Sequence, residues 1–236
     1  MHIFYTQNIR VNTAILDGTE SHHCIKVLRL KQNEVVSLVD GKGGYFEGII
    51  SVADQRACII EIKKSQFEFE KRNFRLHIAI APTKNIERFE WFLEKATEIG
   101  VDEITPLLCQ HSERKILRHD RLEKVLISAM KQSIKAYHPV LNELARFEEF
   151  IELHNTGNKM IAHCMSGERH ELIKIEPVSA EFTLLIGPEG DFADNEVKSA
   201  IDKGFIPVML GAARLRTETA GVASCQIIAD LMAIRS

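Results

Sequence analysis

The sequence predicts an α/β protein in two parts: a small β-rich N-terminal part and a larger part in which strands and helices alternate. Three observations lead to this fold class. The chain has 236 residues, of which 45% are hydrophobic, so there is enough apolar material for a full core. Residues 34–64 contain β-favouring runs separated by turn residues. After residue 75, buried strand patterns alternate with helical periodicity.

The N-terminal part is expected to form a small barrel. Residues 34–52 hold two β-favouring runs, and the glycine-rich turn sequence DGKGG at residues 40–44 lies between them. Residues 56–64 add a further strand. Several short strands joined by tight turns are typical of a small all-β domain.

A short amphipathic stretch, HHCIKVLRL at residues 22–30, precedes these strands and exposes Lys26 and Arg29. Such basic side chains on a small barrel could contact an RNA backbone, and an ordinary surface helix carries the same pattern. Residues 65–74 are charged and poor in apolar runs, so we expect a domain boundary there. The expected domains are residues 1–72 and 73–236.

The second part is expected to be an α/β domain with a mainly parallel sheet, because single strands and helices alternate along it. One of these helices is closed by Gly100, a residue typical of helix C-termini. Strands are expected at 75–82, 101–109, 159–164, 181–186 and 206–210, and helices at 86–100, 120–136, 144–154, 194–203 and 220–234.

The charge distribution does not exclude a nucleic-acid partner. The formal net charge is -3, but residues 1–75 carry 11 Lys/Arg against 9 Asp/Glu, whereas the remainder carries 19 against 24. Within that acidic remainder, residues 111–138 form a local basic stretch. A basic stripe on a helix is typical of phosphate contact and equally of a solvated helix face.

Several classes of protein are not indicated by the sequence. No run of about 18 apolar residues occurs, and the N-terminus lacks a signal-peptide pattern, so a cytosolic protein is expected. The five cysteines have no CxxC spacing, which predicts reduced, mostly buried thiols. His22 and His23 have no further ligand at a suitable spacing, so no metal is expected.

Three loops are expected at the carboxyl ends of parallel strands, where α/β sheets bind their ligands. They are HCMSG at residues 163–167, GPEGDF at 187–192 and GAARLRTET at 211–219. The second loop is neither a Walker motif nor GxGxxG, so a phosphate cradle is not indicated. A tight β-to-α turn explains the same residues.

Helix starts offer candidate caps. Asp191 or Asp194 is expected to cap the helix at 194–203, and Thr217 or Thr219 the final helix. Capping does not explain why an arginine and a glutamate lie beside these threonines. The final helix is apolar over most of its circumference, so we expect its own sheet and a second subunit to cover it.

Taken together, these motifs resemble the RsmE family of the SPOUT superfamily. The resemblance is carried by LLIGPEGDF at 184–192 and LGAARLRTETA at 210–220, with EWFLEKATEIGVDEITPLL at 90–108 upstream and HHCIKVLRL and DGKG near the start. Members of this family are S-adenosylmethionine-dependent enzymes that methylate a uridine of small-subunit ribosomal RNA (16S) at its ring imino nitrogen.

The resemblance implies a PUA-like N-terminal barrel that binds RNA, followed by a SPOUT methyltransferase domain with a deep trefoil knot. It also implies bound S-adenosylmethionine, a cytoplasmic homodimer, and small-subunit ribosomal RNA or an assembled small subunit as partner. No metal or membrane is implied. The implied cofactor-binding residues are Ile186, Gly187, Glu189, Gly190, Leu210, Gly211, Leu215, Arg216, Thr217, Thr219 and Ala220.

The reaction removes a proton and spreads negative charge onto the carbonyls beside the uracil nitrogen. Arg216 is the expected catalytic residue that stabilises this charge. Glu218 is the expected proton acceptor, and an ion pair that orients Arg216 is the other interpretation. The candidate RNA-binding residues are Arg29, Lys84 and Lys95.

The chain departs from the family pattern at three places. Asp191 replaces the last glycine of GPEGG, Ala212 and Ala213 replace the Pro and Arg of LGPRxLRTETA, and Ile3 stands where an arginine is usual. Two other functions stay open: a SPOUT methyltransferase acting on another RNA position such as a ribose hydroxyl, and a non-catalytic RNA-binding assembly factor.

Overall fold

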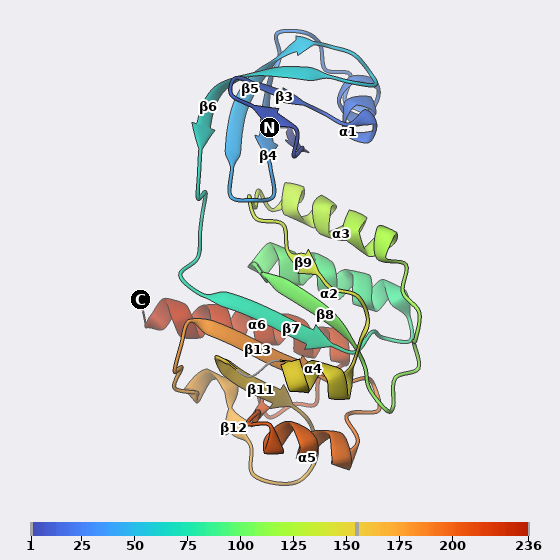
Figure 1. The fold of residues 1–236 in the computed structure, drawn as a ribbon, viewed down its shortest axis with the longest axis vertical. Helices are drawn as coiled ribbons and strands as arrows, with labels where there is room; N and C mark the ends of the chain where they lie inside the picture. The colour runs from blue at the N-terminus through green and yellow to red at the C-terminus, as the bar shows by residue number, and fades with distance from the viewer. Residues whose placement is uncertain (1, 154–155, 236) are drawn as a thin grey trace. The chain divides into compact units, whose positions relative to one another are not determined.

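A computed structural model describes residues 2–153 and 156–235 (Figure 1). It divides into two compact units. The first comprises Met1–Lys71 and Ile127–His138, and the second comprises Arg72–Leu126 and Pro139–Ser236. The contiguous division expected from the sequence leaves residues 127–138 in the second domain, whereas the structure groups them with the first.

The first unit is built on a six-stranded sheet (Figure 1). All of its strand pairs are antiparallel except β1 with β4, which is parallel. The DGKGG turn joins β4 to β5, and its Asp40 Oδ1 accepts the N–H groups of Lys42 (2.7 Å) and Gly44 (2.8 Å). In spatial order the strands are β1 (Ile3–Tyr5), β4 (Val35–Val39), β5 (Tyr45–Val52), β6 (Ile59–Gln66), β3 (Thr13–Ile15) and β2 (Ile9–Arg10).

The amphipathic stretch after β3 is helical. Helix α1 (Gly18–His22) begins at Asp17, whose side chain accepts the Glu20 N–H, and it continues into a π-helical turn, η1 (His23–Val27). Cys24 points into the apolar core of this unit, and Arg29 is exposed just beyond the turn. Ile3, at the position where the family has an arginine, packs against the small apolar cluster formed by Val39, Met130 and Ala136.

Helix α3 (His119–Gln132) is shorter than the helix expected at 120–136. After Gln132 the backbone leaves the helical conformation, with Ile134 at φ 57°. The chain then hydrogen-bonds to the turn between β4 and β5: the Gly43 N–H donates to the Ala136 carbonyl, and the His138 N–H donates to the Gly41 carbonyl, both at 2.9 Å. These bonds replace the last helical turn that the sequence pattern predicted.

The second unit contains an eight-stranded sheet whose strand pairs, within the described residues, are all parallel. The predicted α/β architecture with a parallel sheet is therefore confirmed. The strand order is β10 (Ala145–Arg146), β8 (Glu103–Leu108), β7 (Arg75–Ile80), β13 (Glu181–Ile186), β11 (Asn158–Ala162), β14 (Ile206–Met209) and β12 (His170–Glu171), and β9 (Val140–Leu141) pairs with β8.

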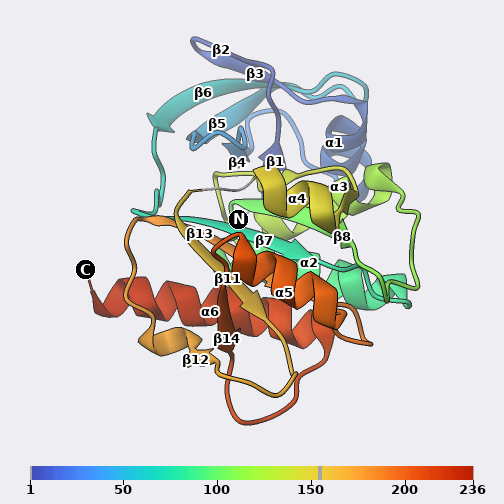
Figure 2. The ribbon, with the colours of Figure 1, turned by 60° about the horizontal axis from the view of Figure 1, so that its bottom comes forward.

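Helices cover both faces of this sheet (Figure 2). Ile78 and Leu184 of the central strands point to one face, where α2 and α6 pack, and their neighbours Ala79 and Leu185 point to the other, where α4 and α5 pack. The helices are α2 (Ile86–Ile99), α4 (Phe147–Leu153), α5 (Asp194–Asp202) and α6 (Thr217–Ile234), with a 3₁₀ turn, η2 (Leu172–Lys174). The helix expected at 144–154 reaches residue 154, which lies outside the described residues.

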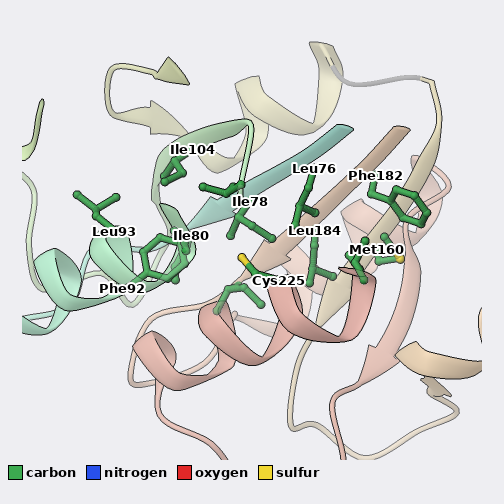
Figure 3. Close-up of a cluster of buried hydrophobic side chains, with 14 of the residues drawn as sticks. Leu76, Ile78, Ile80, Phe92, Leu93, Ile104, Met160, Phe182, Leu184 and Cys225 are labelled. Carbon is green, nitrogen blue, oxygen red and sulfur yellow. The ribbon is translucent and has the colours of Figure 1, made fainter. Parts of the chain in front are cut away.

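The core between α2, α6 and the sheet is closely packed (Figure 3). Gly221 of α6 faces the ring of Phe92 on α2, and a Cβ atom at residue 221 would lie 2.6 Å from that ring and 2.9 Å from Ile80. A residue without a side chain therefore allows α6 to approach α2 and β7 this closely. The first turn of α6 is thereby held beside the first half of α2.

Both expected helix caps are wrong. Neither Asp191 nor Asp194 caps α5: the N-cap residue is Ala193, which has no side chain to accept a hydrogen bond, and the Ala193 N–H donates to the Glu196 carboxylate (2.8 Å). Residue Arg216 precedes α6 and makes no side-chain cap, while the Thr217 hydroxyl donates to the Gly187 carbonyl. The Thr217 and Asp191 side chains instead bond to residues that are distant in the sequence, Gly187 and Cys164.

All five cysteines are free, and four of them are buried, with Cys164 exposed. The described residues contain no helix with the length and apolarity needed to cross a membrane.

Candidate functional site

A cavity of about 700 Å³ lies at the carboxyl ends of β11, β13 and β14. The loops that leave these strands are the three that the sequence singles out, and the structure brings them together around one space. Their lining residues are Ala162, His163, Cys164 and Arg169 from the first, Ile186, Gly187, Pro188, Glu189 and Asp191 from the second, and Val208, Met209, Leu210, Gly211, Ala212, Ala213, Arg214, Leu215, Arg216, Thr217 and Ala220 from the third, with Arg88 from α2.

Side-chain hydrogen bonds fix the GPEGD turn, residues 187–191. The Glu189 carboxylate accepts the backbone N–H of Lys84, at the end of β7, at 2.9 Å. A ring nitrogen of His111 bonds the Asp191 carbonyl at 3.1 Å. The turn is thus attached to the loops that follow both β7 and β8.

Asp191 explains one departure from the family pattern. Its φ is 66°, a left-handed conformation that glycine adopts freely and that Asp tolerates better than most residues. Its carboxylate accepts the N–H of Cys164 through Oδ2 and that of Phe192 through Oδ1, both at 2.8 Å. The aspartate therefore adds a link between the GPEGD turn and the HCMSG loop that a glycine would not make.

Thr217 joins the GPEGD turn to the third loop. Its buried hydroxyl donates to the Gly187 carbonyl at 3.1 Å, across 30 positions of sequence. The start of α6 and the end of β13 are thereby fixed to each other at the wall of the cavity.

The segment between Met209 and Arg216 differs from the GPEGD turn. Residues 211–214 are exposed, and Gly211 has φ 145°, a conformation that favours glycine. Among the described residues we find no hydrogen bond that holds residues 212–215. Ala212 and Ala213, where the family has Pro and Arg, present only methyl groups to the cavity.

His163 brings unpaired polar atoms to the cavity wall. It is buried, and neither ring nitrogen has a hydrogen-bond partner among the described residues. Burial lowers its pKa; the carboxylate of Asp191 opposes this shift and the guanidinium of Arg169 adds to it. Arg169 donates to the His163 carbonyl at 2.8 Å, while its Nε is buried and has no hydrogen-bond partner in the part of the chain that the structure describes. A neutral imidazole and a guanidinium N–H are therefore available to a bound ligand.

A second cavity of about 340 Å³ lies beside α2 and the start of α6. Arg88 and Arg216 line both cavities and so form the wall that they share. The residues that line the second cavity are Asn85, Glu87, Arg88, Trp91, Arg216, Glu218 and Thr219.

Glu218 is a buried carboxylate in this second cavity. Its side chain is 9% exposed, its Oε1 lies 3.9 Å from Arg88 Nε, and its Oε2 is buried without a hydrogen-bond partner in the described residues. The described ion pair thus joins Glu218 to Arg88 rather than to Arg216, the partner considered from the sequence.

The structure brings most of the expected cofactor residues together. Two lie apart: Gly190 faces His111, and Thr219 lines the second cavity with Glu218. The residues that line the first cavity are Ile186, Gly187, Glu189, Leu210, Gly211, Leu215, Arg216, Thr217 and Ala220.

The expected RNA-binding residues belong to different units. Arg29 is exposed in the first unit, and Lys84 and Lys95 belong to the second. The Glu113 carboxylate pairs with Lys84 (2.7 Å) and raises its pKa. Glu94 and Glu98 together neutralise Lys95. Of the three, only Arg29 has no acidic partner among the described residues.

The sequence did not indicate Arg88, Trp91 or Arg169. Arg88 and Trp91 are three residues apart on α2 and so lie on one face of the helix. Polar and aromatic residues on the outer face of an amphipathic helix are typical of a solvated surface, so the sequence pattern alone does not mark these two residues as functional.

Two family models together match residues 16–229. Residues 16–63 match a family described as an RNA methyltransferase PUA domain, and residues 70–229 match one described as an RNA methyltransferase domain. The fold and the ligand-sized cavity at the strand ends therefore define the class of protein, an RNA methyltransferase with a PUA domain.

Individual relatives identify the family within this class. A ribosomal RNA small subunit methyltransferase E from Synechocystis is 30% identical over 227 residues, which cover 93% of this chain and 74% of the relative. The crystal structure of a probable rRNA-methyltransferase from Porphyromonas gingivalis is 39% identical and covers 100% of both chains, with a TM-score of 0.92. The chain belongs to the ribosomal RNA small subunit methyltransferase E family.

A solved relative also has a ligand. The ribosomal RNA small subunit methyltransferase E from Neisseria gonorrhoeae, bound to S-adenosyl methionine, is 28% identical and covers 98% of both chains, with a TM-score of 0.87.

Proposed function

We propose that this protein transfers a methyl group from S-adenosylmethionine to the ring imino nitrogen of a uridine in small-subunit ribosomal RNA. The observation that carries the proposal is the pair of cavities that share Arg88 and Arg216 as a common wall. One cavity is suited to the cofactor, and the other adjoins it where an acceptor must lie for in-line transfer.

The first cavity fits S-adenosylmethionine. That molecule has no phosphate and needs apolar walls and a few polar contacts rather than a glycine-rich phosphate cradle. Ile186, Leu210, Leu215 and Ala220 supply apolar surface. The unpaired nitrogens of His163 and of Arg169 supply polar partners that are buried and free to bind.

When bound, S-adenosylmethionine supplies the methyl group on its sulfonium. The protein contributes alignment, because the two loops joined by Thr217 and Gly187 hold the cavity wall in place. Burial lowers the pKa of His163, which favours a neutral imidazole in the wall of this cavity.

Glu218 and Arg216 would handle the proton and the charge. Loss of the imino proton leaves negative charge on the two uracil carbonyls, and an exposed guanidinium on the shared wall can stabilise it. The free Oε2 of the buried Glu218 is the acceptor that the second cavity offers for the proton.

The test is methyl transfer from labelled S-adenosylmethionine into small ribosomal subunits that lack the modification and into the naked RNA. We expect incorporation into a uridine base, mapped by mass spectrometry, and its loss in Arg216→Ala even when S-adenosylmethionine saturates the protein, because Arg216 also lines the cofactor cavity. Methylation of a ribose hydroxyl would replace the proposed chemistry. RNA binding with no cofactor affinity in the folded protein would instead support a non-catalytic assembly factor.

We further propose the rest of the family's organisation for this chain: a deep trefoil knot in the methyltransferase domain, a cytoplasmic homodimer, and an N-terminal unit that binds RNA. The matched PUA-domain model supports the last of these. Arg29, exposed and without an acidic partner in the described residues, is the candidate for an RNA contact there.

A further inference from the structure

We propose that the second cavity is the subsite for the acceptor base, in which a single pyrimidine taken out of its stack lies against the indole of Trp91 and is read by Arg88, Arg216 and Glu218. This inference rests on the proposed function. It adds a location for the base, roles for Trp91 and Arg88 in holding it, and a reason why uracil is selected over cytosine.

The location follows from how two helices meet. Arg88 and Trp91 lie on one face of α2, and Glu218 lies in the first turn of α6. Gly221, one turn further along α6, lets the two helices approach closely against Phe92. The cavity therefore has walls from two packed helices rather than from loops, and such walls can hold a planar ring in one orientation.

Trp91 supplies an aromatic platform. It is 43% exposed, although a tryptophan buries much apolar surface in most proteins, and it lines the cavity. Proteins that take a base out of its stack hold it by stacking on aromatic side chains. Base–aromatic stacking requires no specific hydrogen bond, so Trp91 would fix the plane of the ring and leave its edge free for recognition.

The polar groups match the edge of uracil. That edge presents one N–H donor between two carbonyl acceptors, and the cavity presents one buried carboxylate oxygen without a partner and two guanidinium groups. Glu218 would accept from the N–H, while Arg88 and Arg216 would donate to the carbonyls. Cytosine has a lone pair at the same ring position and would face the Glu218 carboxylate, so the pocket disfavours it.

Arg88 also orients the Glu218 carboxylate. It is the only residue within 4 Å of the Glu218 carboxylate among the described ion pairs, and it also lines the cofactor cavity. Arg88 thereby orients the Glu218 carboxylate and borders both cavities. Its removal should therefore lower kcat as well as raise KM for the RNA.

The first experiment is kinetic and uses the RNA substrate that the wild-type protein methylates. Trp91→Leu should lower kcat/KM about 10- to 100-fold, whereas Trp91→Phe, which retains an aromatic ring, should stay within a few-fold of wild type. Arg88→Lys should lower kcat, because lysine keeps the charge but lacks the planar guanidinium that donates to the base and orients Glu218. Ile201→Ala is the matched control, because Ile201 is 44% exposed on α5, on the opposite face of the sheet, and should change nothing.

Equal losses in Trp91→Leu and Trp91→Phe, or a change of oligomeric state in either variant by sedimentation, would overturn the subsite, since Trp91 would then serve packing or a subunit contact. Unchanged affinity for S-adenosylmethionine in both Trp91 variants is part of the expected result, because Trp91 lines the second cavity and not the first. Loss of cofactor binding in either Trp91 variant would contradict this assignment.

The second experiment does not depend on turnover. Trp91 is the only tryptophan in the sequence, so the intrinsic tryptophan fluorescence of the protein loaded with S-adenosylhomocysteine reports on this cavity alone. A short single-stranded RNA with one central uridine should quench it, the same RNA with cytidine should quench it less, and Glu218→Gln should reduce that difference. Absence of uridine-dependent quenching would overturn the subsite even if the protein methylates ribosomal RNA. Quenching by a protein that methylates no uridine would sink the proposed reaction and leave the subsite standing.

Discussion

The two loops that contribute most to the first cavity are built in opposite ways. Hydrogen bonds hold the GPEGD turn at residues 187–191 to its surroundings. Thr217 and His111 bond carbonyl groups of the turn, and the turn's own Glu189 and Asp191 carboxylates accept backbone N–H groups of neighbouring loops. The segment at 211–215 is mostly exposed and has only its ends anchored, by β14 and by the start of α6. One loop is fixed before a ligand arrives, and the other is held mainly by its ends.

This difference indicates a division of labour. A fixed turn can present its backbone to a cofactor without any ordering cost, whereas a segment with few contacts can move to admit a ligand of this size. Stability should therefore respond to changes in the turn and little to changes in the exposed segment. Cofactor affinity should respond to both.

The largest effect is expected for Asp191→Ala. This change removes two hydrogen bonds and places alanine at φ 66°, so we expect the free energy of unfolding to fall by about 2–3 kcal/mol. Urea unfolding measures it. Asp191→Gly loses the same bonds without the backbone strain and should cost about 1 kcal/mol less; equal costs for the two variants would show that the conformation of residue 191 is unstrained.

Thr217→Val should have the next largest effect. It retains the shape of the side chain but leaves the buried Gly187 carbonyl without its partner, which costs about 1–2 kcal/mol of stability. Cofactor affinity measured by calorimetry should fall as well, because the two loops lose their link. Thr217→Ser keeps the hydroxyl and is the control. Unchanged stability in Thr217→Val would contradict the prediction, because valine keeps the methyl group and lacks only the hydroxyl.

A smaller effect on stability and cofactor affinity is expected when acid pH protonates His163. Because burial lowers the folded-state pKa of His163 below its unfolded value of about 6.5, the stability that its neutral form contributes is present above that pH and is lost as the pH falls through the folded-state pKa. Cofactor affinity should weaken over the same range, since protonation of His163 adds a positive charge to the cavity proposed for a cationic cofactor. His163→Gln should flatten this acid limb in both measurements, and an unchanged limb would assign it to another group.

The smallest effect is expected for Arg214→Ala in the exposed segment. With no hydrogen bond to lose among the described residues, the unfolding free energy should stay within about 0.5 kcal/mol of wild type. The double change Ala212→Pro and Ala213→Arg, which restores the family pattern, should likewise leave stability nearly unchanged while strengthening cofactor binding. A loss above about 1 kcal/mol in either protein would break the contrast between the two loops.

Much of the fold was predictable because its main elements carry strong periodic patterns. The long strands and helices of the second unit appear where the sequence predicts them, within a few residues. The two-residue strands β9, β10 and β12 were missed, since two residues carry no periodicity. The end of α3 was placed too late because its terminating contacts are with a turn some 90 positions earlier in the chain.

The candidate site, like the fold, was predictable only in part. Loops at strand ends are identifiable from sequence because a parallel sheet brings them together, and nine of the expected cofactor residues line one cavity. The predicted helix caps were wrong in part because Thr217 and Asp191 bond to residues distant in the sequence, Gly187 and Cys164. Arg88 and Trp91 come from the middle of a helix, and only the packing of α6 against α2 gives them a shared space.

The segment at 127–138 has a consequence for how the chain is made. Met130 and Ala136 pack against Val39, and Gly43 hydrogen-bonds to Ala136, so the first unit is incomplete until these residues exist. A ribosome translating this protein has by then passed through β7, α2 and β8. The N-terminal unit thus cannot finish folding as an independent nascent domain. It must wait, with part of its apolar surface uncovered, while the first third of the next domain is synthesised.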